Sequence, residues 1–259
     1  TFRSETELLG AYRGLQGRVQ LAAPRLFNTQ GMPALEVRAV EPQRAQSATS
    51  GSYMRPSGNG STPGIFYVNT SNLSSRRTWE AESLYLHEAV PGHHYQLGLQ
   101  QLLTDLPKFR RLGGETAYIE GWGLYAESLG PELGLYQDPY SYYGYLQNAL
   151  WRSIRLVTDT GLHSKGWTRA KAIDYMVDNA AMTRSDAEAE VDRYMAIPGQ
   201  ALAYKVGEMK IAQLREQAQR ELGPRFDVRA FHTEVLKDGS VPLDILQDKI
   251  QRWIAAQKR

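Results

Sequence analysis

The spacing of apolar positions predicts a chain that is mostly helical. Apolar residues recur at helical spacing over residues 4–23, which begin with Ser4 and carry Glu7 three residues later, a capping-box pattern. Pro24 ends this first helix. The same spacing predicts further helices over residues 78–90, 93–103, 115–130, 140–157, 168–179, 185–195, 200–222, 227–236 and 243–257.

Strand-like patterns occur only before residue 78. Residues 35–40 alternate between apolar and polar side chains, and residues 65–70 form a compact β-branched and aromatic run. Residues 41–64, rich in Ser, Gly and Pro, are predicted to be a long loop. The 65–70 strand either pairs with an extended peptide, with Tyr67 and Asn69 as substrate contacts, or is a plain core strand. We therefore expect a mainly α, multi-helix domain with a two- to three-stranded β element before the helix at residue 78.

That helix is interrupted at a cluster of candidate metal ligands. Three of the five histidines and a carboxylate lie within residues 87–94, which read His-Glu-Ala-Val-Pro-Gly-His-His. The stretch is close to the zinc-protease signature H-E-x-x-H, in which two histidines one turn apart bind zinc and the glutamate activates water. Here the position of the second histidine is Pro91, which breaks the helix.

Composition narrows the possible functions. The 259 residues are 42% hydrophobic and 22% charged, with a net charge of +2. This balance gives no electrostatic case for nucleic acid, and no apolar run approaches the roughly 20 residues of a membrane span. The absence of cysteine excludes thiol catalysis and thiolate metal sites. A metal would therefore be held by histidine and carboxylate.

The break at Pro91-Gly92 makes the histidine spacing workable. In a regular helix, residues six apart are separated by about 9 Å along the axis, too far to share a zinc ion. A wide turn after His87 would return a second histidine to the metal. We favour His93 over its neighbour His94, which becomes a substrate or supporting group.

A catalytic zinc site needs a third protein ligand. Glu120 is the candidate, since its helix neighbours are aromatic and apolar rather than polar. Glu127, seven residues later on the same face, would orient a histidine ligand by a hydrogen bond. The expected cofactor is one mononuclear zinc ion held by His87, His93 and Glu120.

This arrangement suggests hydrolysis by metal-activated water. Glu88 would be the general base. Candidate donors to the oxyanion are Tyr204, His163, Arg193 and Tyr194. Arg152 and Arg193 could bind a substrate carboxylate.

Other readings remain open at this stage. The cluster could be only a corner between helices, or a non-catalytic module that binds a metal or a peptide. The residues fit hydrolysis of a peptide, and equally of an ester or a non-peptide amide. The partner is thus a peptide or small-molecule substrate.

Several blocks of the sequence resemble one bacterial family. They are residues 67–70, 87–96, 120–127, 159–163 and 198–204, and they are similar, in order, to blocks of the DUF885 family, a domain of unknown function whose members look like distant relatives of the gluzincin metallopeptidases. The resemblance implies a helical zinc-peptidase-like fold, with His87, His93 and Glu120 as ligands and Glu88 as base. It also implies that residues 1–259 are one catalytic-type domain forming the C-terminal part of a longer protein. The partner would be the missing N-terminal half, and the location periplasmic or secreted rather than cytoplasmic.

Overall fold

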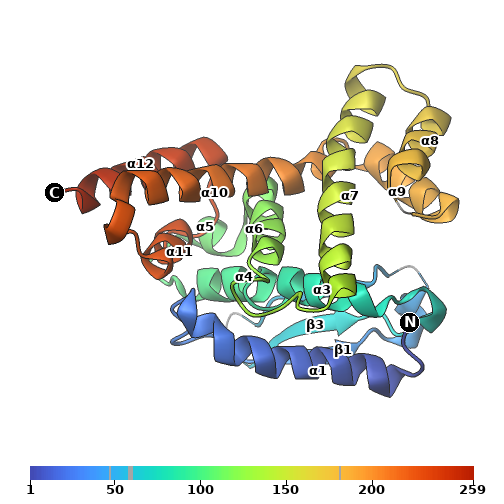
Figure 1. Ribbon diagram of the computed structural model, residues 1–259, viewed down its shortest axis with the longest axis horizontal. Coiled ribbons are helices and arrows are strands. Elements are labelled where there is room, and N and C mark those ends of the chain that lie inside the picture. The colour runs from blue at the N-terminus through green and yellow to red at the C-terminus, as the bar shows by residue number, and fades with distance from the viewer. Residues whose placement is uncertain (47, 58–60, 181) are drawn as a thin grey trace.

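The protein is a helical assembly built over a small sheet (Figure 1). The computed structural model describes residues 1–259 apart from 47, 58–60 and 181. Helix α1 (Glu5–Ala22) lies along one side of the sheet, and α3 (Ala81–Glu88) with α4 (His93–Leu102) lies along the other (Figure 1). The prediction of a mainly α fold with a small β element is confirmed. No helix among the described residues is long and apolar enough to span a membrane.

The sheet has the strand order β1-β3-β2. Strand β3 (Gly64–Val68) is buried along its whole length and pairs parallel with β1 (Leu35–Ala39) and antiparallel with β2 (Gly51–Met54). Both edges of β3 are therefore occupied, and the prediction that this strand pairs with a peptide is wrong. Its alternative, a core strand, is correct.

The stretch predicted to be a loop contains regular structure. Within residues 41–64 the described part includes α2 (Pro42–Ala45) and β2, which forms an edge of the sheet. Strand β2 is four residues long and lacks an alternating apolar pattern, so its pairing with β3 is what makes it a strand. Residues 47 and 58–60 of the predicted loop lie outside the described residues.

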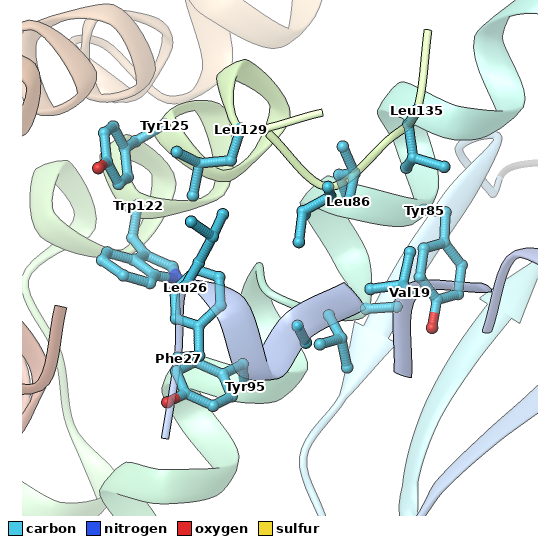
Figure 2. Close-up of a cluster of buried hydrophobic side chains, with 14 of the residues drawn as sticks. Val19, Leu26, Phe27, Tyr85, Leu86, Tyr95, Trp122, Tyr125, Leu129 and Leu135 are labelled. Atoms are coloured by element: carbon cyan, nitrogen blue, oxygen red, sulfur yellow. The ribbon is translucent and has the colours of Figure 1, made fainter. Parts of the chain in front are cut away.

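Helices α6 (Thr116–Ser128) and α10 (Gln200–Leu222) form the close-packed centre of the molecule. They meet at two glycines: a Cβ on Gly121 would lie 2.4 Å from the Cα of Gly207. Any side chain at this crossing would push the helices apart. Figure 2 shows Trp122 and Leu129 of α6 facing Leu26 and Phe27, which follow α1. This core fixes the position of α6.

A second, smaller core holds the outer part of the chain. It lies between the C-terminal half of α7 (Pro139–Ser164), the start of α10, α8 (Arg169–Asn179) and α9 (Arg184–Ala196). We call this part the outer lobe; it projects at the upper right of Figure 1. The remaining helices are α5 (Lys108–Leu112), α11 (Val228–Leu236) and α12 (Leu243–Gln257). Of the helices, α2 and α5 were not predicted, and α7 runs to residue 164 rather than 157.

Candidate metal centre

Three predicted ligands meet at the junction of α3, α4 and α6. The Nε2 atoms of His87 and His93 each lie 3.4 Å from Oε2 of Glu120. All three potential donor atoms lie within 4.8 Å of one another. Both histidines are buried, and the Glu120 side chain is 18% exposed. The cluster is therefore largely enclosed by protein and is partly open to solvent on the side of Glu120.

The helix break is what brings the two histidines together. Helix α3 ends at Glu88 and α4 begins at His93, so the two imidazole rings stand almost perpendicular with their centroids 4.7 Å apart. The turn is fixed from α6, because the Trp122 indole N–H donates to the Pro91 carbonyl at 2.8 Å. Gly92 is required in the turn, since a Cβ there would lie 1.9 Å from the His87 carbonyl oxygen.

The ring of His87 also depends on a glycine across the helix interface. A Cβ at Gly123 would lie 2.7 Å from Cε1 of His87. Helix α6 thus presents Glu120 to the centre and, one turn later, leaves the space that the imidazole fills. Two glycines of α6 thus each allow a close approach: Gly121 against α10 and Gly123 against His87.

Glu127 supports His87 from behind, as predicted. Its Oε1 accepts from Nδ1 of His87 at 2.8 Å, and its Oε2 accepts from the hydroxyl of Ser83. The guanidinium of Arg152 lies 3.8 Å from the same Oε1. Because a carboxylate can only accept, Nδ1 of His87 carries the hydrogen and Nε2 faces the centre.

The electrostatics of the cluster favour a cation. Burial would lower the pKa of His87, but hydrogen bonds with Glu120 and Glu127 raise it to about 10. Burial would raise the pKa of Glu120, but contacts with His87 and His93 hold it well below its usual value. The same opposition lowers the pKa of Glu127, with Arg152 and His87 outweighing burial. Without a metal, His87 carries a proton that offsets the negative charge of the neighbouring carboxylates.

The donor set fits zinc. Bonds of about 2.0–2.1 Å in a tetrahedron place neighbouring donors about 3.3–3.4 Å apart, close to the 3.4 Å between Glu120 and each histidine. One zinc charge of +2 would balance Glu88 and Glu120, while Glu127 is balanced by Arg152. Two imidazoles and a carboxylate leave a fourth position open for water.

Glu88 follows His87 directly and ends α3. Its side chain is half-buried, and among the described residues it makes no hydrogen bond or ion pair. Its charge contributes to raising the pKa of His87. Glu88 is thus next to a candidate ligand in the chain, with a carboxylate that has no hydrogen-bond or ion-pair partner among the described residues.

His94 is excluded as a ligand by its own hydrogen bonds. Its Nε2 lies 3.0 Å from the Pro33 carbonyl, and its Nδ1 lies 3.1 Å from the hydroxyl of Tyr53. A carbonyl only accepts, so Nε2 donates and Nδ1 accepts from Tyr53. Burial lowers the pKa of His94 to about 4, which keeps the ring neutral. His94 joins α4 to β2 and to the segment before β1, and the choice of His93 over His94 agrees with this geometry.

Tyr204 lies at the edge of the cluster. Its ring is nearly parallel to that of His87, with centroids 6.1 Å apart. Its hydroxyl accepts from the side-chain amide of Gln200 at 3.2 Å, and the guanidinium of Arg155 stacks 4.6 Å from the ring centroid. Tyr204 is therefore beside the centre, with its hydroxyl held by its own helix.

The structure does not bring the other predicted oxyanion donors to the cluster. His163 bonds Asp159 at 3.2 Å and lies eleven residues beyond Arg152 on α7, about 16 Å along the helix. Arg193 donates to Gln200 at 3.1 Å, and the hydroxyl of Tyr194 accepts from Arg155 at 3.1 Å. Both Arg193 and Tyr194 belong to α9 of the outer lobe.

Tyr67 and Asn69 have structural contacts instead of a place at the cluster. Tyr67 is buried against the segment that includes Ala45, and the amide of Asn69 donates to the carbonyls of Ala45 and Ala48 at 2.8 and 2.9 Å. Arg152, predicted to bind a substrate carboxylate, instead faces Glu127 and Asn148. Two supporting residues, Ser83 and Asn148, were missed because nothing in their own sequence surroundings marks them.

Comparisons with known proteins agree on the fold and leave the activity open. A family described as bacterial proteins of unknown function, DUF885, matches residues 1–250. A solved structure described as "the putative lipoprotein from Colwellia psychrerythraea" is 41% identical, with a TM-score of 0.93 over 96% of this chain and 43% of that one. Another, described as a putative lipoprotein of unknown function from Shewanella oneidensis, is 25% identical, with a TM-score of 0.76 over 96% of this chain and 46% of that one. This chain thus spans less than half the length of either, and no curated protein matches it.

Proposed function

The chain belongs to the DUF885 family of bacterial proteins of unknown function, and from that premise we propose that it is a zinc-dependent hydrolase that cleaves peptides with metal-activated water. One observation carries the proposal. His87, His93 and Glu120 converge on a partly open side of the protein, each histidine 3.4 Å from Glu120 and all three donor atoms within 4.8 Å of one another, and the carboxylate of Glu88, unpaired among the described residues, follows His87 in the chain. Purely structural zinc sites usually fill all four positions with protein ligands, mostly cysteine, and this chain has none.

The residues divide the chemistry between them. A bound zinc ion would supply a water molecule whose pKa is lowered towards 7. Glu88 accepts the proton of that water. Glu127 keeps the His87 ring oriented, and Tyr204 beside His87 is the candidate donor to the oxyanion. The H-E-x-x-P-G-H-H arrangement then differs from H-E-x-x-H only in the turn that returns the second ligand.

A peptide substrate is supported by the sheet edge rather than by the strand first expected. Strand β2 pairs with β3 on one side, and its residues Ser52 and Met54 are exposed. Strand β2 lies against α3 and α4, which carry the two histidines. An extended peptide added to the free edge of β2 would therefore run beside the cluster.

The location we propose is outside the cytoplasm, in the periplasm or anchored at a membrane surface. Both similar structures are described as lipoproteins, although those names concern the longer proteins. The whole protein's substrate would be a peptide met in that compartment.

The test is metal content and peptide hydrolysis in three proteins: the wild type, Glu88→Gln and the surface control Glu216→Gln. We expect one zinc per chain in all three, and a peptidase rate lowered about 10²–10⁴-fold only in Glu88→Gln. The variant His87→Ala should lose the zinc. Stoichiometric zinc without Glu88-dependent turnover of a peptide library would leave a metal-binding module. Turnover of esters or non-peptide amides alone would replace the substrate class.

A further inference from the structure

Next to the candidate ligand His87, on the side of Glu127, four side chains from three helices form a closed ring of hydrogen bonds and one ion pair. Ser83 of α3 donates to Glu127 of α6 and accepts from the amide of Asn148 on α7 at 3.0 Å. The carbonyl oxygen of Asn148 accepts from Nη1 of Arg152 at 3.1 Å, and Nη2 of Arg152 lies 3.8 Å from Glu127. Ser83, Glu127 and Arg152 are buried, and Asn148 is half-buried.

The direction of each hydrogen bond in the ring follows from the guanidinium of Arg152. A guanidinium only donates, so the Asn148 oxygen must face Arg152 and its NH₂ group must face Ser83. The Ser83 hydroxyl then has its oxygen occupied by Asn148 and gives its hydrogen to Glu127. Both oxygens of Glu127 are thereby held: Oε2 by Ser83, and Oε1 between Arg152 and Nδ1 of His87. Because both of its oxygens are engaged, the carboxylate is fixed in one orientation towards Nδ1 of His87.

We propose that Asn148 and Arg152 are positioning residues for the metal centre, which act through Ser83 and Glu127 to hold the His87 ring in its metal-binding orientation. Helix α7 contributes no ligand, yet it sets the affinity for the metal. The proposal rests on the proposed function in one respect, the presence of the metal. The orientation of His87 can also be examined without it.

This assignment differs from a role for Arg152 in binding a substrate carboxylate. Nη1 of Arg152 serves Asn148, Nη2 faces Glu127, and the side chain is only 10% exposed. Its guanidinium also stacks 4.5 Å from the ring centroid of Trp151, which holds the plane of the group. A substrate carboxylate would have to displace Glu127 from this guanidinium and so release His87.

The experiment compares Asn148→Ala, Arg152→Gln and Arg152→Lys with the control Gln147→Ala. Gln147 neighbours Asn148 on α7 but bonds Tyr143 at the surface. Zinc affinity is measured by competition with a chelator, and the ligand field by the visible absorption of the cobalt-substituted protein. We expect zinc to bind about 10–100-fold more weakly in Asn148→Ala and Arg152→Gln, with a changed cobalt spectrum. Arg152→Lys should recover part of the loss, and Gln147→Ala should match the wild type.

A second measurement separates failure of this proposal from failure of the proposed function. In the metal-free protein, the ring signals of His87 in NMR spectra should be a single sharp set in the wild type and Gln147→Ala, and shifted or broadened in Asn148→Ala. Folded variants with unchanged zinc affinity and cobalt spectrum would overturn the proposal. If the wild type binds no zinc, the proposed function fails, and unchanged His87 signals in Asn148→Ala would then overturn the positioning role as well.

Discussion

The main body and the outer lobe of this protein are built differently. The core of the body is lined by large, fully buried aromatic side chains such as Trp122, Tyr85 and Phe66, and it encloses hydrogen-bonded polar groups such as His232 and Glu127. The core of the lobe is small and consists mainly of Ala, Ile, Val and Met, and exposed ion pairs connect its helices. The comparison teaches where the candidate ligands can be held: side chains that must be positioned to a fraction of an ångström need closely packed surroundings, and the large interlocking side chains of the body core supply them.

The largest expected effect is on the pH dependence of the free energy of unfolding, which a histidine in the body should govern and a histidine in the lobe should not. In the body, His232 is buried between the Leu26 carbonyl and the hydroxyl of Tyr125, and burial lowers its pKa from 6.5 to about 3. Between pH 6.5 and about 3, His232 is therefore protonated in the unfolded chain but neutral in the folded chain. The contribution of His232 to stability is complete above pH 6.5 and falls by about 1.4 kcal/mol per pH unit below it, until the folded pKa near 3 is reached.

Denaturant unfolding from pH 7 to pH 4.5 measures this slope. We expect His232→Asn to reduce it by the contribution of this histidine, leaving that of His94, at some cost in stability at pH 7. His163→Asn, a matched replacement in the half-exposed lobe histidine, should leave the slope as in the wild type. An unchanged slope in His232→Asn would show that the buried histidine does not govern the acid response.

A smaller effect should follow from adding one methyl group in the body. Gly121→Ala places a Cβ 2.4 Å from Gly207, so α6 must move away from α10 and carry Glu120 with it. We expect a loss of roughly 1–3 kcal/mol in the free energy of unfolding and weaker zinc binding. Gly10→Ala, at a helical position with nothing within 4 Å, is the control and should stabilise by about 0.5–1 kcal/mol. Equal stability of the two variants would contradict the close crossing.

The smallest effect is expected in the lobe. Arg169 forms a two-pronged ion pair with Asp192, joining α8 to α9 at 2.6 and 2.9 Å, but both side chains are about half exposed. Removing it with Arg169→Ala should change the free energy of unfolding very little, because water and salt screen such pairs. Zinc binding should not change. A loss of zinc affinity in this variant would show that the lobe and the metal cluster are coupled more tightly than their separate cores indicate.

Much of the fold could be predicted from the sequence because its signals are local. Helix periodicity, the capping residue Ser4 and the breaker Pro91 each act within a few neighbours, and the structure has the helices they indicate. Strand β2 could not be found in this way, since it is a strand through its pairing with β3 rather than through a pattern of its own.

The residues of the candidate site show the same difference between local signals and long-range contacts. His87, His93 and Glu120 were recognisable because residue type and spacing carry the chemistry of a ligand. The state of His94 was not, because it depends on Pro33 and Tyr53, which lie 61 and 41 residues away in the chain. His163 looked equally suitable by residue type, but its place at the far end of a 26-residue helix separates it from the cluster. The ring through Ser83 and Asn148 joins three helices, so no pattern within one stretch of the sequence predicts it.

The close contact between Gly123 and the imidazole of His87 gives a criterion for comparing homologous sequences. Since a Cβ there would lie 2.7 Å from the imidazole of His87, a homologue can retain every ligand and still be unable to place them if that glycine has changed to a larger residue. The pattern Glu-Gly-Trp-Gly is therefore a better criterion of competence than the histidines alone. Family members that keep the histidines but lose the second glycine are the ones we expect to bind zinc poorly or not at all.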